Sequence, residues 1–231
     1  MRPDTLSSLL AARAAKQQVA LVSHLESGEQ TLVYRDRTDG ALALDDAAVA
    51  AARDALRDDK SGRMRRDDDA PLFVQVFNPP KRMIIVGAVH IAQPLVTLAQ
   101  TAGYEAVIVD PRGAFATRDR FPGVTLSEDW PDDALNALGV DNRTAVVTLT
   151  HDPKLDDPAL HVALRSEAFY IGSLGSKRTH AGRVERLTAA GFTDAEIGRI
   201  HAPVGLAINA KSPAEIAVSI MAQVTQVLHG G

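Results

Sequence analysis

The sequence predicts an α/β protein in which a doubly wound parallel sheet follows a smaller α/β domain. From residue 81 onward, continuous apolar runs such as residues 83–86 and 106–109 are typical of strands buried on both faces of a parallel sheet. Segments with helical spacing separate most of these runs, and strand alternating with helix is the pattern of a doubly wound sheet. The prolines at positions 79 and 80 stop the preceding strand. We therefore expect domains at residues 1–80 and 81–231.

The composition narrows the function before any motif is considered. The chain has 231 residues, a net charge of −4 and no cysteine, which excludes disulfides, thiolate metal sites and cysteine nucleophiles. Basic residues are not concentrated in either half, so nothing favours nucleic-acid binding. No apolar run approaches the roughly 20 residues of a membrane span, and the N-terminus lacks a signal-peptide pattern. We expect a cytoplasmic protein with no membrane span and no nucleic-acid partner.

Residues 1–80 are expected to form a helix, a hairpin, a second helix and a further strand. Asp4 precedes leucines at helical spacing and is expected to cap the first helix. A turn at residues 27–28 separates two β-rich runs, which is the pattern of a hairpin. The expected elements are a helix from residue 4, strands at 19–25 and 30–34, a helix at 45–56, a charged loop at 58–69 and a strand at 72–77.

The second part contains four expected buried strands and several helices. Thr193 and Glu196 are spaced as a capping box, and Ser212 and Glu215 form another with proline at the first helical position. In the closing helix, a stripe formed by Ile216, Ile220 and Val224 is typical of core or of a dimer surface. The expected elements are strands at 83–86, 106–109, 145–149 and 168–171, a helix at 91–102 and an irregular connection at 111–130.

All four of these strands end in polar or glycine residues. Ligands of open α/β sheets bind beyond the carboxyl ends of the strands, so we predict a small-molecule site there. Taken singly, each signal is weak: a lone histidine such as His90 is more often structural, and His151 and Asp152 could be a hydrogen-bonded pair in a loop. A metal site from His90, His151 and Asp152 is conceivable but lacks a ligand signature. The strand-end residues are Gly87 and His90, then Asp110 and Arg112, then His151 and Asp152, then the segment 172–176.

The segment after the fourth strand is the most informative part of the chain. Glycines let backbone N–H groups approach a ligand closely, and a helix N-terminus favours anions. Cations in a first helical turn oppose the helix dipole unless an anion lies near them. We predict an anion-binding loop here, with an ordinary strand-to-helix turn as the alternative. Its residues are Gly172, Ser173, Gly175 and Ser176, followed by Lys177 and Arg178.

A pyridine dinucleotide is a further candidate ligand. Asp110 lies about 20 residues after the first glycine turn, where a dinucleotide-binding fold places its ribose carboxylate. Arg112 beside it would suit a further phosphate, with a solvated side chain as the alternative. However, Val89 occupies the position of the second glycine of the usual fingerprint, and its side chain should obstruct the pyrophosphate. NAD(P) is therefore the less favoured ligand.

Several motifs occur in order over most of residues 81–231. They are V-G-A-V-H-I-A around His90, V-D-P-R at 109–112, R-F-P-G-V from Arg120, T-H-D at 150–152, F-Y-I-G-S-L-G-S-K-R from Phe169, and H-A-P-V-G-L-A-I-N-A-K-S-P-A-E-I-A-V-S-I from His201. In these motifs the chain resembles the XdhC/CoxI family, the maturation factors of xanthine dehydrogenase and related molybdenum hydroxylases. Residues 1–80 resemble a shortened form of the family's N-terminal domain.

The resemblance implies a Rossmann-like domain behind a small α/β domain, usually in a homodimer. It implies an accessory protein that binds molybdenum cofactor (molybdopterin), supports its sulfuration by a cysteine desulfurase, and delivers it to the apo-hydroxylase. On this basis the loop 172–178 and His90 become contacts to an anionic pterin phosphate or dinucleotide. Such a protein is a maturation factor rather than a catalyst.

The chain departs from the family pattern in two places. It lacks the glycine-and-cysteine segment of the N-terminal domain, at residues 39–46, and it has Val89 in the first glycine turn. Without a thiolate the chain cannot itself carry persulfide sulfur. Two alternatives to a maturation factor remain: an NAD(P)-dependent oxidoreductase of a small substrate, and a non-catalytic Rossmann-like interaction protein.

Overall fold

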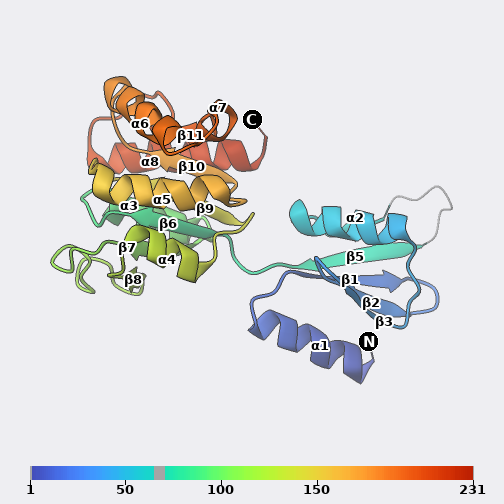
Figure 1. The fold of residues 1–231 in the computed structure, drawn as a ribbon. Coiled ribbons are helices and arrows are strands. Elements are labelled where there is room, and N and C mark those ends of the chain that lie inside the picture. The colour runs from blue at the N-terminus through green and yellow to red at the C-terminus, as the bar shows by residue number, and fades with distance from the viewer. Residues whose placement is uncertain (1, 65–70, 231) are drawn as a thin grey trace. The chain divides into compact units, whose positions relative to one another are not determined.

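The computed structural model describes residues 2–64 and 71–230, and divides the chain into two compact units. The units span residues 1–79 and 80–231 (Figure 1). Part of the predicted charged loop at 58–69 lies outside the described residues. Within the described residues, no helix has the length and apolar character needed to cross a membrane.

The first unit is an antiparallel sheet with one helix packed on each face (Figure 1). The central strand β1 is buried on both faces because its side chains alternate. Leu21 contributes to the cluster that contains Leu9 of α1, whereas Val22 contributes to the cluster that contains Ala52 of α2. The sheet order is β3-β2-β1-β5-β4. The elements are α1 (Pro3–Ala14), β1 (Val19–His24), β2 (Gln30–Val33), β3 (Thr38–Gly40), α2 (Asp46–Arg57), β4 (Gly62–Arg63) and β5 (Leu72–Phe77).

Most predicted elements of this unit are present, with small differences at their ends. The predicted cap of the first helix is wrong: α1 begins at Pro3, with Arg2 at the cap position and Asp4 in the first turn. Proline suits the first helical position because its missing N–H would have no helical partner there. Asp45 caps α2 by accepting a hydrogen bond from the Ala48 N–H at 2.7 Å. The short strands β3 and β4 were not predicted.

The second unit contains a six-stranded, entirely parallel sheet of order β11-β10-β9-β6-β7-β8. Counted from its first strand and read from the β8 edge, this order is 3-2-1-4-5-6, the order of doubly wound dinucleotide-binding folds. The predicted fold class is confirmed. The sequence did not predict the short edge strands β8 and β11. The strands are β6 (Arg82–Val86), β7 (Glu105–Val109), β8 (Thr125–Ser127), β9 (Thr144–Thr148), β10 (Tyr170–Ser173) and β11 (Ile200–His201).

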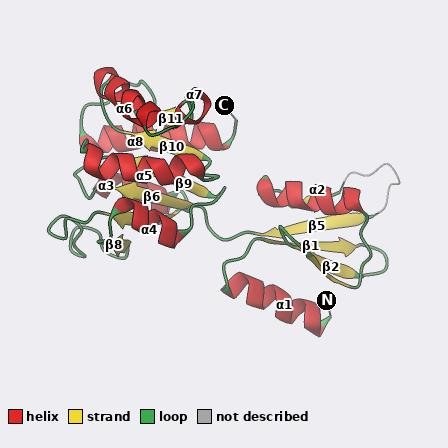
Figure 2. Ribbon diagram, in the orientation of Figure 1, coloured by secondary structure: helices red, strands yellow, loops and turns green. Residues whose placement is uncertain are grey.

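Helices cover both faces of this sheet (Figure 2). Alternate residues of each strand point to opposite faces, so Ile85 packs with α3 and α8, while Ile84 packs with α4, α5, α6 and α7. The helices are α3 (Ala92–Thr101), α4 (Pro131–Leu138), α5 (Pro153–Arg165), α6 (Lys177–Ala189), α7 (Asp194–Ile197) and α8 (Pro213–Leu228).

The closing helix α8 confirms one prediction and decides between the two alternatives of another. Both predicted capping boxes are formed, at Thr193 before α7 and at Ser212 before α8. However, the apolar stripe of α8 does not form a free surface. Ile220 and Val224 are fully buried, and Ile216 is partly buried against the same core as α3. The stripe is therefore core and is not available to a dimer partner.

Candidate ligand site at the carboxyl edge of the parallel sheet

Strands β6 and β9 are neighbours in the sheet, but the chain continues from β6 to β7 on one side and from β9 to β10 on the other. The carboxyl ends of β6 and β9 are therefore the topological switch point, where folds of this kind bind ligands. The loops that follow these strands are packed closely together. Gly87 has φ +107°, and a Cβ atom there would lie 2.6 Å from Cγ2 of Thr150. Gly87 is thus required by backbone conformation and by this packing, so its presence does not by itself indicate a ligand.

His90 lies in the turn between β6 and α3, and its side chain is exposed. The preceding residue, Val89, is partly buried and packs against the core beneath α3 and α8. The first turn of α3 has no side-chain cap. His90 therefore stands at the carboxyl edge and remains a proposed ligand contact.

Asp110 does not lie open to a ribose, which corrects its predicted role. It is fully buried, and its carboxylate accepts hydrogen bonds from the N–H groups of Ala88 (2.8 Å) and Arg112 (3.0 Å). The Arg112 guanidinium also donates to both carboxylate oxygens, each at 2.8 Å. Burial raises the pKa of Asp110, but these hydrogen bonds outweigh it and leave the pKa below its ordinary value. Asp110 ties the end of β7 to the turn after β6.

The interaction with Asp110 also engages two donor atoms of Arg112, Nε and Nη2. Its hydrogen bonds to Asp110 raise the pKa of the guanidinium against the opposing effect of burial. The guanidinium carbon also lies 4.7 Å from the centre of the Phe115 ring. The side chain of Arg112 remains 40% exposed, so its charge is accessible to a ligand at the edge. However, its Nε and Nη2 already donate hydrogen bonds to Asp110.

The segment after β9 has two different roles. Asp152 is the N-cap of α5 and accepts a hydrogen bond from the Lys154 N–H at 3.0 Å. His151 is exposed and adopts φ +61°, a conformation uncommon for residues other than glycine. The described residues contain no group of three or more histidine, aspartate or glutamate side chains placed to hold a metal ion. The alternative metal site of His90, His151 and Asp152 therefore has no support.

The predicted anion loop begins later than expected. Gly172 and Ser173 belong to β10 and pair with Val147 and Thr148 of β9. A Cβ atom at Gly172 would lie 2.6 Å from Cγ2 of Val204, and the Ser173 hydroxyl is buried 2.6 Å from that of Thr148. These contacts explain both residues without a ligand, so we do not propose them as ligand contacts.

The rest of the segment forms the entrance to α6. Gly175 has φ +143°, and Ser176 caps the helix by accepting a hydrogen bond from the Thr179 N–H at 3.1 Å. Lys177 and Arg178 are exposed in the first turn. Neither side chain has a hydrogen-bond or ion-pair partner within the described part of the chain. Gly175 and Ser176 have structural reasons for their identity, and Lys177 and Arg178 keep free charge for a ligand.

Sequence reasoning missed a buried ion pair beneath this entrance. Asp156 of α5 and Arg183 of α6 each have side chains 2% exposed, and Nη2 of Arg183 lies 3.8 Å from Oδ2 of Asp156. Burial raises the pKa of Asp156 and lowers that of Arg183. The available signal was that each charged residue falls among the buried positions of its helix, beside Leu155 and Leu187 respectively.

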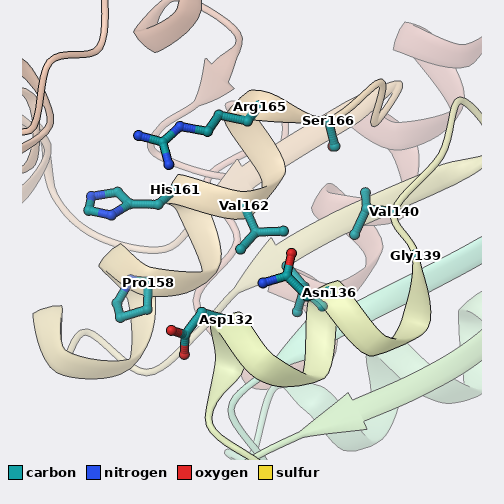
Figure 3. Close-up of a pocket in the computed structure, with 10 residues that line it drawn as sticks. Asp132, Asn136, Gly139, Val140, Pro158, His161, Val162, Arg165 and Ser166 are labelled. Atoms are coloured by element: carbon teal, nitrogen blue, oxygen red, sulfur yellow. The ribbon is translucent and has the colours of Figure 1, made fainter.

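Two hollows lie on the face covered by α4, α5 and α6. The larger, of about 610 Å³, is a groove between α5, with Pro158, His161 and Val162, and α4, with Asp132 and Asn136 (Figure 3). It contains none of the predicted site residues. The smaller, of about 290 Å³, lies between the start of α5 and residues 178–186 of α6, and we call it the α5–α6 pocket. It is lined by His151, Pro153, Asp156, Arg178, Thr179, Gly182, Arg183 and Arg186.

These observations define a Rossmann-type domain with basic side chains at the carboxyl edge of its sheet. Residues 83–224 match the XdhC Rossmann domain family, and the chain belongs to this family. The family resemblance found in the sequence is thereby confirmed.

Individual relatives agree with this assignment. The chain is 32% identical over 161 residues to a Bacillus subtilis protein named as a probable xanthine dehydrogenase subunit, covering 69% of this chain and 47% of that protein. It is 32% identical over 151 residues to the molybdenum cofactor insertion chaperone PaoD of Escherichia coli, covering 65% of this chain and 41% of PaoD. The chain thus spans less than half the length of these two curated relatives.

A solved structure resembles nearly the whole chain. The crystal structure of a protein from Bacillus halodurans, described as a xanthine dehydrogenase, covers 98% of this chain with a TM-score of 0.70 and 27% identity. This chain covers 64% of that protein. The match extends beyond the parallel sheet and includes the small N-terminal unit.

Proposed function

We propose that this protein binds molybdenum cofactor and hands it to a molybdenum hydroxylase of the xanthine dehydrogenase class during maturation of that enzyme. The observation that carries the proposal is membership of the XdhC Rossmann domain family, together with 32% identity to a protein named as a molybdenum cofactor insertion chaperone. In this role the protein is a binding and transfer factor without turnover of its own.

The carboxyl edge of the sheet has the chemistry that an anionic cofactor requires. Lys177 and Arg178 lie free at the entrance to α6, and His90 and His151 follow the two strands of the switch point. Beneath them, Nε and Nη1 of the buried Arg183 have no hydrogen-bond partner among the described residues. Unsatisfied donors and free cations at one edge fit a ligand that carries phosphate oxygens.

An NAD(P)-dependent oxidoreductase is less well supported. In a dinucleotide-binding fold, the carboxylate after the second strand hydrogen-bonds a ribose hydroxyl. Here both oxygens of Asp110 are engaged by Arg112 and by the turn after β6. Binding a ribose at this position would require the breaking of a buried, charged hydrogen-bond network.

The partners are part of the proposal. Because the chain contains no cysteine, it cannot form a persulfide, and sulfur would pass from a cysteine desulfurase directly to the bound cofactor. We also propose a homodimer, formed through a surface other than the apolar stripe of α8. Co-purification from the native host, followed by measurement of the oligomeric mass, tests both proposals.

The transfer itself can be measured with purified components. The protein is incubated with released molybdenum cofactor, separated from free cofactor, and mixed with cofactor-free hydroxylase. Cofactor should co-elute with the protein and then appear in the hydroxylase, whose activity should rise. The double variant Lys177→Gln/Arg178→Gln should retain less cofactor, while Arg118→Gln, an exposed arginine in the loop after β7, should behave as the wild type. No retention of cofactor by the wild type would refute the proposal.

A further inference from the structure

Arg183 is in an unusual position for a charged side chain. It lies on the buried face of α6 next to Leu187, and its guanidinium makes a single described hydrogen bond, from Nη2 to the carbonyl oxygen of Leu174 at 3.1 Å. Its Nε and Nη1 are buried without partners, as is Oδ2 of Asp156. Buried charges are normally paired and hydrogen-bonded because desolvation is costly. The local protein structure leaves this guanidinium undersatisfied.

Asp156 does not complete the pair. Its Oδ1 accepts hydrogen bonds from the hydroxyl of Thr150 at 2.7 Å and from the Thr150 N–H at 3.3 Å, which holds the carboxylate toward β9. The nearest atoms of the two charged groups therefore remain 3.8 Å apart, beyond direct hydrogen-bond distance. The free donors of Arg183 require acceptors from elsewhere.

Arg183 is one of the residues that line the α5–α6 pocket. Of the cations that line the pocket, Arg186 is held by Asp157 through Nε at 2.5 Å and Nη2 at 3.0 Å. Arg178 is exposed and has no partner in the described chain, and His151, in the segment after β9, also lines the pocket. Among these residues, Asp156 supplies the only carboxylate, so unsatisfied positive charge predominates.

The volume of the pocket limits the ligand. At about 290 Å³ it is just below the range for small-molecule sites, which begins near 300 Å³. It can admit a phosphate group and the atoms next to it, but not a whole dinucleotide. A phosphate monoester presents several acceptor oxygens and forms strong charge-assisted hydrogen bonds with arginine.

We propose that the α5–α6 pocket is a phosphate site, with Arg183 at its base and Arg178 at its rim. It takes the terminal phosphate of the cofactor, and this last assignment rests on the proposed function. Binding requires a small shift of the Arg183 side chain toward the pocket, because its Nε and Nη1 are buried.

Gly182 allows the pocket to be blocked without removing a charge. It lies in α6 and lines the pocket, and a Cβ atom there would meet only Nη1 of Arg186, at 3.6 Å, an ordinary contact distance. Gly182→Ala should therefore fold and bind as the wild type does. Gly182→Leu should fold as well, but its side chain would occupy the space needed by the phosphate.

The first experiment measures binding of inorganic phosphate by calorimetry, with chloride at matched ionic strength as the control. We expect saturable binding by the wild type and by Gly182→Ala. Affinity should fall about tenfold or more in Arg178→Gln and Gly182→Leu, the loss expected for a charge-assisted hydrogen bond or a filled site. Arg165→Gln removes an exposed arginine of α5 that lines the other hollow, and should leave affinity unchanged. Absence of saturable binding, or equal affinity in Gly182→Leu and Gly182→Ala, would overturn the phosphate site.

The cofactor transfer assay separates this inference from the proposed function. If Gly182→Leu loses phosphate binding and also loses cofactor retention, the assignment to the cofactor's phosphate is supported. If it loses phosphate binding yet retains cofactor at wild-type levels, that assignment is overturned and the proposed function stands. If the wild type binds phosphate but never retains cofactor, the proposed function fails and the phosphate site itself stands.

Discussion

The guanidinium of Arg112 donates two parallel hydrogen bonds to the carboxylate of Asp110, although the two residues are only two positions apart in the sequence. Nε donates to one carboxylate oxygen and Nη2 to the other, each at 2.8 Å, while the Ala88 N–H donates to the same carboxylate from the turn after β6. The pair therefore joins the ends of two adjacent parallel strands. A carboxylate that occupies the position of a ribose-binding residue here serves to hold the edge of the sheet together.

Asp110→Asn should lower the free energy of unfolding by about 1–3 kcal/mol, because a neutral amide loses the charge-assisted bonds to Arg112. This loss of stability should be smaller than for a fully buried ion pair, because the Arg112 side chain is 40% exposed and its guanidinium can hydrogen-bond to water instead. Urea denaturation measures the change. Asp119→Asn, in the exposed loop after β7, is the matched control and should stay within about 0.5 kcal/mol of the wild type.

The contribution of Asp110 should also depend on pH. Its folded-state pKa is lowered, so its stabilising effect is complete above the unfolded pKa of about 3.9 and is lost as pH falls through the folded value. The stability difference between wild type and Asp110→Asn should therefore be largest near neutral pH and shrink below about pH 4. Urea denaturation of both proteins from neutral to acid pH tests this. A difference that grows on acidification would contradict the assignment.

Gly175 is constrained by the fold itself. At φ +143° a side chain is strained, and a Cβ atom would lie 3.0 Å from Cγ2 of Thr179. Gly175→Ala should therefore destabilise the protein by about 1–3 kcal/mol. Thr179→Ser removes Cγ2 and keeps the hydroxyl that bonds Ser176, so it should recover part of this loss in the double variant. A double-mutant cycle measured by urea denaturation gives the coupling, and zero coupling would show that backbone strain alone is responsible.

The sequence predicted the architecture well because its strongest signals are local. The continuous apolar runs that became β6, β7 and β9 are buried on both faces, and the capping boxes at Thr193 and Ser212 depend only on residues three positions apart. The edge strands β8 and β11 were missed because they are short and are defined by pairing with distant segments. A local sequence pattern contains no information about pairing between distant segments.

The candidate site was predicted less completely, for a related reason. Polar residues after strands mark the correct edge of the sheet, but their sequence does not say which of them face a ligand. Asp110 accepts a hydrogen bond from the Ala88 N–H and Ser173 hydrogen-bonds the hydroxyl of Thr148, and only tertiary structure brings these distant partners together. Conversely, no motif or strand end marks Arg183 in the sequence. Its importance appears only when α5, β9 and α6 are assembled around it.

The last prediction concerns Val89 and the dinucleotide alternative. If Val89 alone obstructed a pyrophosphate, Val89→Gly should create affinity for NAD or NADP. The structure predicts otherwise, because Asp110 remains occupied by Arg112 and Val89 itself packs against the core of α3 and α8.

Val89→Gly should gain no measurable dinucleotide affinity and should lose about 1–2 kcal/mol of stability from lost burial and added backbone entropy. Val89→Ala separates these two effects, since it removes most of the side chain without the glycine backbone. Calorimetric titration with NAD and NADP, together with urea denaturation, measures both outcomes. Micromolar dinucleotide binding by Val89→Gly would show that a ribose can replace the hydrogen bonds that Asp110 now accepts from Arg112 and Ala88. That result would restore the oxidoreductase alternative.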